Sequence, residues 1–171
     1  MVENELTRAI RELVSEAVKN FALPTKPERG FAEGELRAPK VVNGYLPPKR
    51  SGQDDDFPFV LVRADEGATE QDSTEVRVSI IVGTYSEEYD GHEYCLNVMS
   101  RIRTALCSLP GMVLANRYRL KHPIKWSTYA EQPYPYWQLD MQTTWDIRTP
   151  QPIDKAVSYT HLRAHETAAN L

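Results

Sequence analysis

Four side chains of the sequence are of the types that bind zinc, and their spacing decides whether a metal site is plausible. They are His92, Cys95, Cys107 and His122, and imidazole and thiolate are preferred zinc ligands. On a helix His92 and Cys95 would share one side, but Cys107 lies three turns further on, and alternation places His122 on the apolar face of a strand. Core packing accounts for these residues better than ligation. We therefore expect no metal and no cofactor.

Catalytic patterns give no candidate either. No serine or cysteine stands in a nucleophile-elbow pattern, and the sequence has no glycine-rich phosphate loop. Neighbouring carboxylates such as Glu87 and Glu88, and the run 54–56, fall in expected loops, where runs of charge are usually solvated. We expect the chain not to be an enzyme, and we nominate no catalytic residue.

Basic and apolar residues alternate over 117–126, which predicts a strand with two different faces. Side chains two apart on a strand share a face, and a second strand over 137–148 alternates in the same way, as is typical of an antiparallel sheet with one solvated side. Cations and rings of the first strand could suit a single nucleic-acid strand, but they would point to opposite sides, which disfavours that function. The predicted basic face consists of Arg117, Arg119, Lys121 and Lys125.

The segment that joins these two strands, 131–137, is rich in aromatic residues and contains two prolines. Proline removes backbone donors and favours extended geometry in the residue before it, so the segment cannot be a central strand. We predict a stiff aromatic corner with Tyr134, Tyr136 and Trp137. These side chains either close the core beneath the strands or form a contact surface, because aromatic residues dominate both settings.

The remaining periodicities predict two helices and a second hairpin. Apolar residues recur at helical spacing over 5–21 and again from Cys95 to Leu106. Apolar runs at 57–63 and 76–82 predict two strands of a hairpin. Its expected tip, Ala64 to Thr74, is acidic and contains Asp65, Glu66, Glu70 and Asp72.

Together these elements predict an α+β fold: an antiparallel sheet of about four or five strands with two helices packed on one face. Residues 1–156 are expected to form one domain. Within it, 24–52 is a long connection rich in proline and glycine, with a short strand near 41–45 and a possible role as a partner-binding arm.

Composition narrows the class of protein. The sequence has 171 residues and a formal net charge of -4, which argues against nonspecific binding of nucleic acid by the whole surface. No charged-then-apolar leader and no apolar run of membrane length are present, so we expect a soluble protein made in the cytosol, with two reduced cysteines. Residues 157–167 match the translation of a transposase-type sequencing adapter, so we interpret 157–171 as a non-native read-through tail.

Three stretches, in this order, resemble the tail terminator (tail completion) proteins of long-tailed bacteriophages and prophages. They are the hairpin from Asp56 to Tyr85, the helix from about Gly91 to Leu106, and the segment from Pro123 to Trp137. The resemblance implies a virion structural protein that forms a ring, typically a hexamer, on the finished tail tube and docks to the head connector. It implies no catalysis. The long segment before Asp56 departs from a minimal terminator.

A ring needs two complementary surfaces on each subunit, and the acidic tip and the basic face are the natural pair. Opposite potentials steer encounter and fix register. The expected partners are thus further copies of the chain, the tail tube protein and a head connector or head-closure protein, at the head–tail junction of the virion. Another head–tail connector subunit, or a nucleic-acid-binding accessory protein that uses the basic strand, are the alternatives.

Overall fold

The computed structural model describes residues 2–28, 30–49 and 55–148. The predicted read-through tail, 157–171, lies outside the described residues. The elements follow the chain in this order: α1 (Val2–Val18), β1 (Leu23–Pro24), β2 (Leu36–Arg37), β3 (Lys40–Asn43), β4 (Phe59–Thr69), β5 (Ser73–Tyr85), α2 (His92–Cys107), the short 3-10 helix η1 (Pro110–Met112), β6 (Val113–Leu114), β7 (Tyr118–Thr128) and β8 (Tyr136–Arg148).

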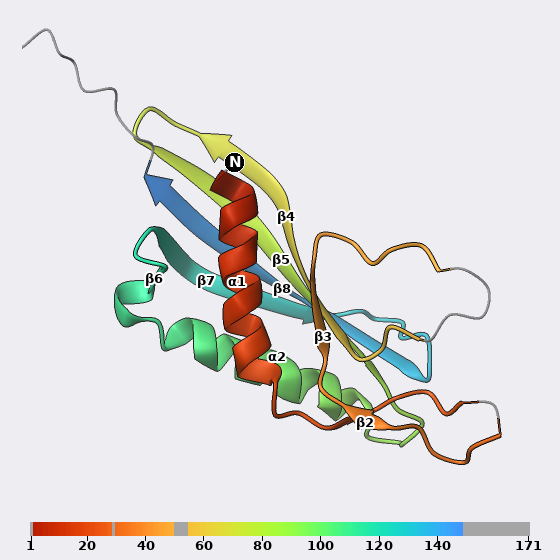
Figure 1. The fold of residues 1–171 in the computed structure, drawn as a ribbon. Coiled ribbons are helices and arrows are strands. Elements are labelled where there is room, and N and C mark those ends of the chain that lie inside the picture. Colours follow the sequence, from red (N-terminus) through yellow and green to blue (C-terminus); the bar gives the residue numbers. More distant parts are fainter. Residues whose placement is uncertain (1, 29, 50–54, 149–171) are drawn as a thin grey trace, which may run out of the picture.

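The main sheet has six strands in the order β3-β4-β5-β8-β7-β6 (Figure 1). All neighbours are antiparallel except β3 and β4, which run parallel. The expected α+β class with a largely antiparallel sheet is therefore correct. The strand number exceeds the expected four or five because two short pieces, β3 and β6, extend the edges. A separate two-stranded ladder joins β1 and β2 in the proline-rich segment.

Both helices cover the same face of this sheet (Figure 1). Helix α1 buries one apolar residue per turn, namely Leu6, Ile10, Val14 and Val18, because residues three to four apart share a side of a helix. Helix α2 buries the predicted stripe of Cys95, Val98, Met99, Ile102 and Leu106. Among the described residues, no helix has the length and apolar character needed to cross a membrane.

The first hairpin is longer than its apolar runs predict. β4 continues to Thr69 and β5 begins at Ser73, so the predicted tip from Ala64 to Thr74 is mostly paired strand, with a bulge between Ala64 and Glu66. Every residue of β4 from Ala64 onward is exposed. Because 64–69 buries no residue, its sequence shows no alternation of apolar and polar residues. The predicted strand therefore ends at residue 63.

Alternation in β7 also breaks where the sequence pattern suggested continuity. Tyr118 and Leu120 are buried as predicted, but the ladder with β8 shifts between Lys121 and Lys125, and His122 is exposed. The prediction that His122 lies on the apolar face is therefore wrong. Trp126 pairs with the buried Met141 and therefore lies on the helix face of the sheet. It is nevertheless 45% exposed, because it stands at the edge of the sheet.

A buried polar chain crosses the centre of the core. The indole Nε1 of Trp145 donates to the Thr143 hydroxyl at 2.9 Å, and that hydroxyl donates to the carbonyl of Val78 at 3.0 Å. All three residues are fully buried, so the indole N–H of Trp145 relies on the threonine hydroxyl as its acceptor.

We expect Thr143→Val to lower the free energy of unfolding by about 1–3 kcal/mol, although valine has nearly the same shape, because an indole N–H loses its acceptor in the core. Urea denaturation measures this change. The exposed Thr128→Val in β7 is the matched control and should change stability by less than about 0.5 kcal/mol. Equal stability of Thr143→Val and the parent protein would show that the hydroxyl is not a required bridge.

Candidate functional site

The sheet face opposite the two helices, here called the open face, carries most of the charged residues predicted to form a contact surface. Cross-strand partners in the ladder share a face, so the register identifies its members. The charged residues of the open face are Arg63, Asp65 and Glu66 on β4, Glu75 and Arg77 on β5, Asp140, Asp146 and Arg148 on β8, and Arg119, Lys121 and Lys125 on β7.

Acidic and basic residues of the open face pair with each other inside one subunit. The Lys121 ammonium lies 2.8 Å from the Glu75 carboxylate, two strands away, and this hydrogen bond raises the pKa of Lys121. Arg77 lies 2.7 Å from Glu66. Since both pairs are about half exposed, each contributes little to stability and can be exchanged for another partner.

The structure separates Arg117 from the other predicted basic residues. Arg119, Lys121 and Lys125 share the open face as predicted. Arg117 precedes β7 and extends toward α1, where its guanidinium lies 2.8 Å from Glu5. The predicted four-residue basic face is therefore a three-residue face.

The four predicted acidic residues also occupy two different settings. Asp65 and Glu66 lie within β4; Asp65 is 2.7 Å from Arg63 and accepts a short hydrogen bond from Ser79. Glu70 and Asp72 lie in the turn between β4 and β5, which the backbone N–H of Glu70 closes by donating to the Ser73 carbonyl. The acidic tip is thus smaller than the predicted one.

Consecutive residues of the aromatic corner point to opposite faces. Trp137 packs on the helix side, where its Nε1 donates to the Ser86 carbonyl at 3.0 Å. Tyr136 lies on the open-face side, with ring centroids 4.6 Å from Phe57 and 5.4 Å from Tyr85. Tyr134 is 62% exposed, and its hydroxyl donates to the Glu87 carbonyl. The corner therefore closes the core and also displays one aromatic ring at the surface.

A mostly apolar pocket of about 220 Å³ lies between this corner and α2, lined in part by His92, Cys95, Tyr129 and Trp137. The Cys95 thiol donates to the Val82 carbonyl at 3.4 Å, and burial raises its pKa to about 12. Burial together with the hydrogen bond to Asp140 raises the pKa of Tyr129 to about 12. Neither group is prepared for acid–base chemistry near neutral pH.

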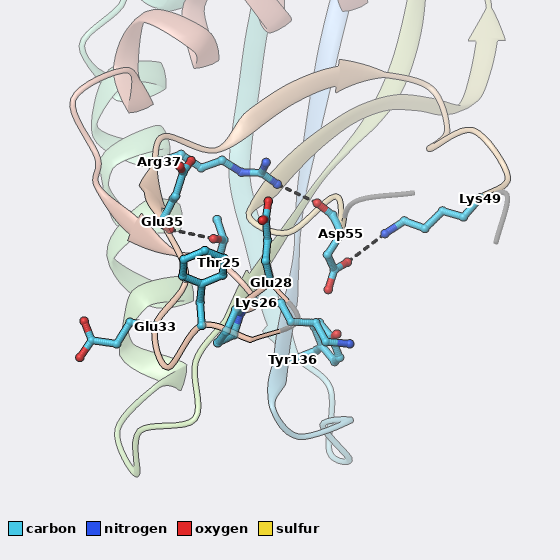
Figure 2. Close-up of a pocket in the computed structure, with 12 residues that line it drawn as sticks. Thr25, Lys26, Glu28, Glu33, Glu35, Arg37, Lys49, Asp55 and Tyr136 are labelled. Atoms are coloured by element: carbon cyan, nitrogen blue, oxygen red, sulfur yellow. Dashed lines mark hydrogen bonds and ion pairs between the residues drawn. The ribbon is translucent and has the colours of Figure 1, made fainter. Parts of the chain in front are cut away.

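The proline-rich segment forms a second, more polar pocket of about 570 Å³ (Figure 2). Arg37 donates to the backbone carbonyls of Asp55 and Phe57 at 2.8 and 2.7 Å, and Lys49 lies 2.9 Å from the Asp55 carboxylate. Burial works to raise the pKa of Asp55, but its interactions with Lys49 and Tyr136 outweigh burial and lower it. These contacts, which the sequence did not indicate, attach the segment to the sheet.

The four residues considered as zinc ligands do not form a site. Cys95 is buried, whereas His92, Cys107 and His122 are exposed. Across residues 2–28, 30–49 and 55–148, no group of three or more His, Cys, Asp or Glu side chains could hold a metal ion.

No model of a known protein family matches the chain, and a search of curated proteins finds no significant similarity.

We expect one reactive thiol per folded chain at pH 8. The exposed Cys107 should react with a chromogenic disulfide reagent, whereas Cys95, whose thiolate is disfavoured by burial, should react only after denaturation. Counting thiols with and without denaturant checks this. Cys107→Ser should abolish the native reaction, and Cys95→Ala should leave it; two equally fast thiols in the folded protein would contradict the buried position of Cys95.

We also expect Asp55→Asn to weaken attachment of the proline-rich segment in a pH-dependent way. A lowered folded pKa contributes stability above the unfolded value of 3.8, and that contribution is lost as the pH falls through the folded pKa. Because Lys49 is 41% exposed, the loss at pH 6 should be at most about 1 kcal/mol. Urea denaturation should show the difference from the parent shrinking at acidic pH. A difference independent of pH would indicate that the carboxylate charge is unimportant.

Proposed function

We propose that the chain is a structural, non-catalytic subunit of the head–tail joint of a long-tailed phage or prophage, and specifically a tail terminator. In this role it forms a ring, of which a hexamer is the leading form, on the finished tail tube and docks to the head connector. The protein is made in the host cytoplasm and functions in the virion. Its partners are further copies of itself, the tube protein and a connector or head-closure protein.

The observation that carries this proposal is the arrangement from β4 to β8. Helix α2 lies between two long hairpins, and the aromatic corner of the second hairpin packs beside the start of that helix through Trp137, Ser86 and His92. This is the element order on which the resemblance to tail terminators rests. The open face adds a large charged surface, and no helix of the described residues lies over it, so it is available for contact with other subunits.

Charge is distributed unevenly across the open face, which suits head-to-tail assembly. Three cations stand on β7 at one side of the sheet, whereas β4 at the other side carries two carboxylates and one cation, Arg63. A ring requires each subunit to present two different, complementary surfaces. Since the same residues also pair within the subunit, charge is better suited to selecting and orienting the neighbour than to holding it.

Two alternatives remain. Another connector or head-closure subunit would share this chemistry and differ only in partner. A nucleic-acid-binding accessory protein would use Arg119, Lys121 and Lys125, but Asp140 and Asp146 stand on the adjacent strand of the same face and would repel phosphate. The charge pattern therefore supports contact between proteins better than binding to nucleic acid.

Light scattering on the full chain after size exclusion, over a range of concentrations and two salt levels, tests the proposal. We expect a species whose mass is a multiple of the 19.5 kDa subunit, close to six copies, alongside monomer. A strict monomer that instead binds a single-stranded oligonucleotide with steep salt dependence would overturn the proposal in favour of the accessory protein.

A further inference from the structure

Two long strands of the main sheet have outer edges that the subunit leaves largely uncovered. β3 pairs with β4 only from Phe59 to Val62, and β6 pairs with β7 only at Tyr118 and Arg119. Within the described part of the chain, no further strand pairs with the outer edge of 63–69 or with that of 120–128. Such edges present unpaired backbone groups that can accept another strand.

The two uncovered stretches overlap in height over 63–67 of β4 and 120–125 of β7. Beyond this overlap, 126–128 stands level with the part of β4 that β3 covers, and 68–69 stands level with the part of β7 that β6 covers. On the open face, one rung of the ladders runs through Arg63, Ser79, Gln142 and Lys125, and the next through Glu66, Arg77, Thr144 and Lys121.

Strand direction is also compatible with pairing between copies. Three successive antiparallel ladders, β4–β5, β5–β8 and β8–β7, make β4 and β7 of one subunit antiparallel. A rotation about an axis roughly along the strands preserves direction, so β7 of one copy and β4 of the next would meet as an antiparallel pair. This geometry gives perpendicular, well-formed hydrogen bonds.

Each edge carries features that discourage pairing with unrelated strands. β7 has a bulge between Lys121 and Lys125 that contains Pro123, and β4 has a bulge at Asp65. Prolines, lysines and bulges on edge strands oppose indiscriminate association. Here both bulges fall between the same two rungs, and Lys121 of one edge stands level with Glu66 of the other, while Lys125 stands level with Arg63. These features disfavour pairing with unrelated strands and leave one complementary pair of charges, Glu66 and Lys121, to favour a second copy of the chain.

We propose that 63–67 of β4 in one copy pairs antiparallel with 120–125 of β7 in the next, so that the sheets of neighbouring subunits join between the short edge strands β3 and β6. The partner is a second copy of this chain, and the contact is head-to-tail. The proposal rests on the proposed ring-forming function and specifies how the ring is held together. Glu66 then lies beside Lys121 of the neighbour, where each can exchange its internal partner for the one across the interface.

Disulfide trapping tests this contact in the full chain. Glu66→Cys and Lys121→Cys are combined in a Cys107→Ser background, which removes the exposed native thiol. Within one subunit three strand spacings, roughly 14 Å, separate the two positions, so an internal disulfide cannot form. Under oxidising conditions we expect a covalent ladder that exceeds the dimer and ends at the size of the ring.

Each single cysteine variant should give a dimer at most, because it offers one accessible thiol per chain, the remaining Cys95 being buried. A control pair on the exposed sides of the helices, Arg8→Cys with Arg103→Cys, should give no ladder. Circular dichroism verifies that every variant is folded. Moving the second cysteine from position 121 to 125 tests the register, and the expected result is a weaker ladder.

Charge reversal provides a second measurement that needs no cysteine. Glu66→Lys and Lys121→Glu should each raise the concentration at which the ring dissociates by roughly two- to tenfold, and the double variant should recover most of the loss. A ring-sized mass without a disulfide ladder would overturn the edge pairing and leave the proposed function standing. A monomer that gives no ladder at high concentration would also overturn the pairing, whereas the function would then be judged by whether the chain binds tail tubes.

Discussion

The antiparallel ladder between β5 and β8 is the contact on which the rest of the structure depends. It runs from Ser73–Arg148 to Tyr85–Tyr136 without a register break, and it joins two hairpins that are far apart in sequence. Its inward residues, including Val78, Met141 and Trp145, form the surface onto which α2 packs, and α1 packs against α2 and the β3–β4 side of the sheet. Without this ladder the sheet would divide into two small units, each a hairpin with one short edge strand, and neither would have the buried face that gives a sheet independent stability.

The β5–β8 ladder is regular along its whole length, whereas the ladders on either side of it contain bulges. Residues alternate strictly between core and open face at its centre, so a slip of one residue would bury Asp140 and Asp146 and expose the core. Among the described strands, the register shifts lie in the neighbouring β4–β5 and β7–β8 pairings. A regular centre with irregular edges is compatible with the proposed assembly of this chain into a ring.

Apolar periodicity predicted the helices and strands that bury one face. It did not predict the features that depend on contacts between residues far apart in sequence. Both helices, the strands of β5 and β8 and the α+β class followed from apolar spacing. The outer half of β4 was missed because both its faces are exposed, and Arg117 was assigned to the wrong surface because its partner, Glu5, is far away in sequence. The attachment of Arg37 to two backbone carbonyls leaves no trace in residue types. Strand order, and hence which charges share the open face, is likewise absent from any local pattern.

The aromatic corner shows how one short segment can connect three parts of the molecule. Because Tyr136 and Trp137 are consecutive in a strand, they must point to opposite faces. Tyr136 contacts Phe57 and interacts with Asp55, which anchors the proline-rich segment, while Trp137 is bonded to Ser86 just before α2. Gly91 is needed there, since a Cβ at this position would lie 2.7 Å from the Trp137 indole nitrogen. The exposed Tyr134 therefore stands on a corner fixed from both sides, so a partner that binds it meets a preorganised surface and loses little free energy to ordering.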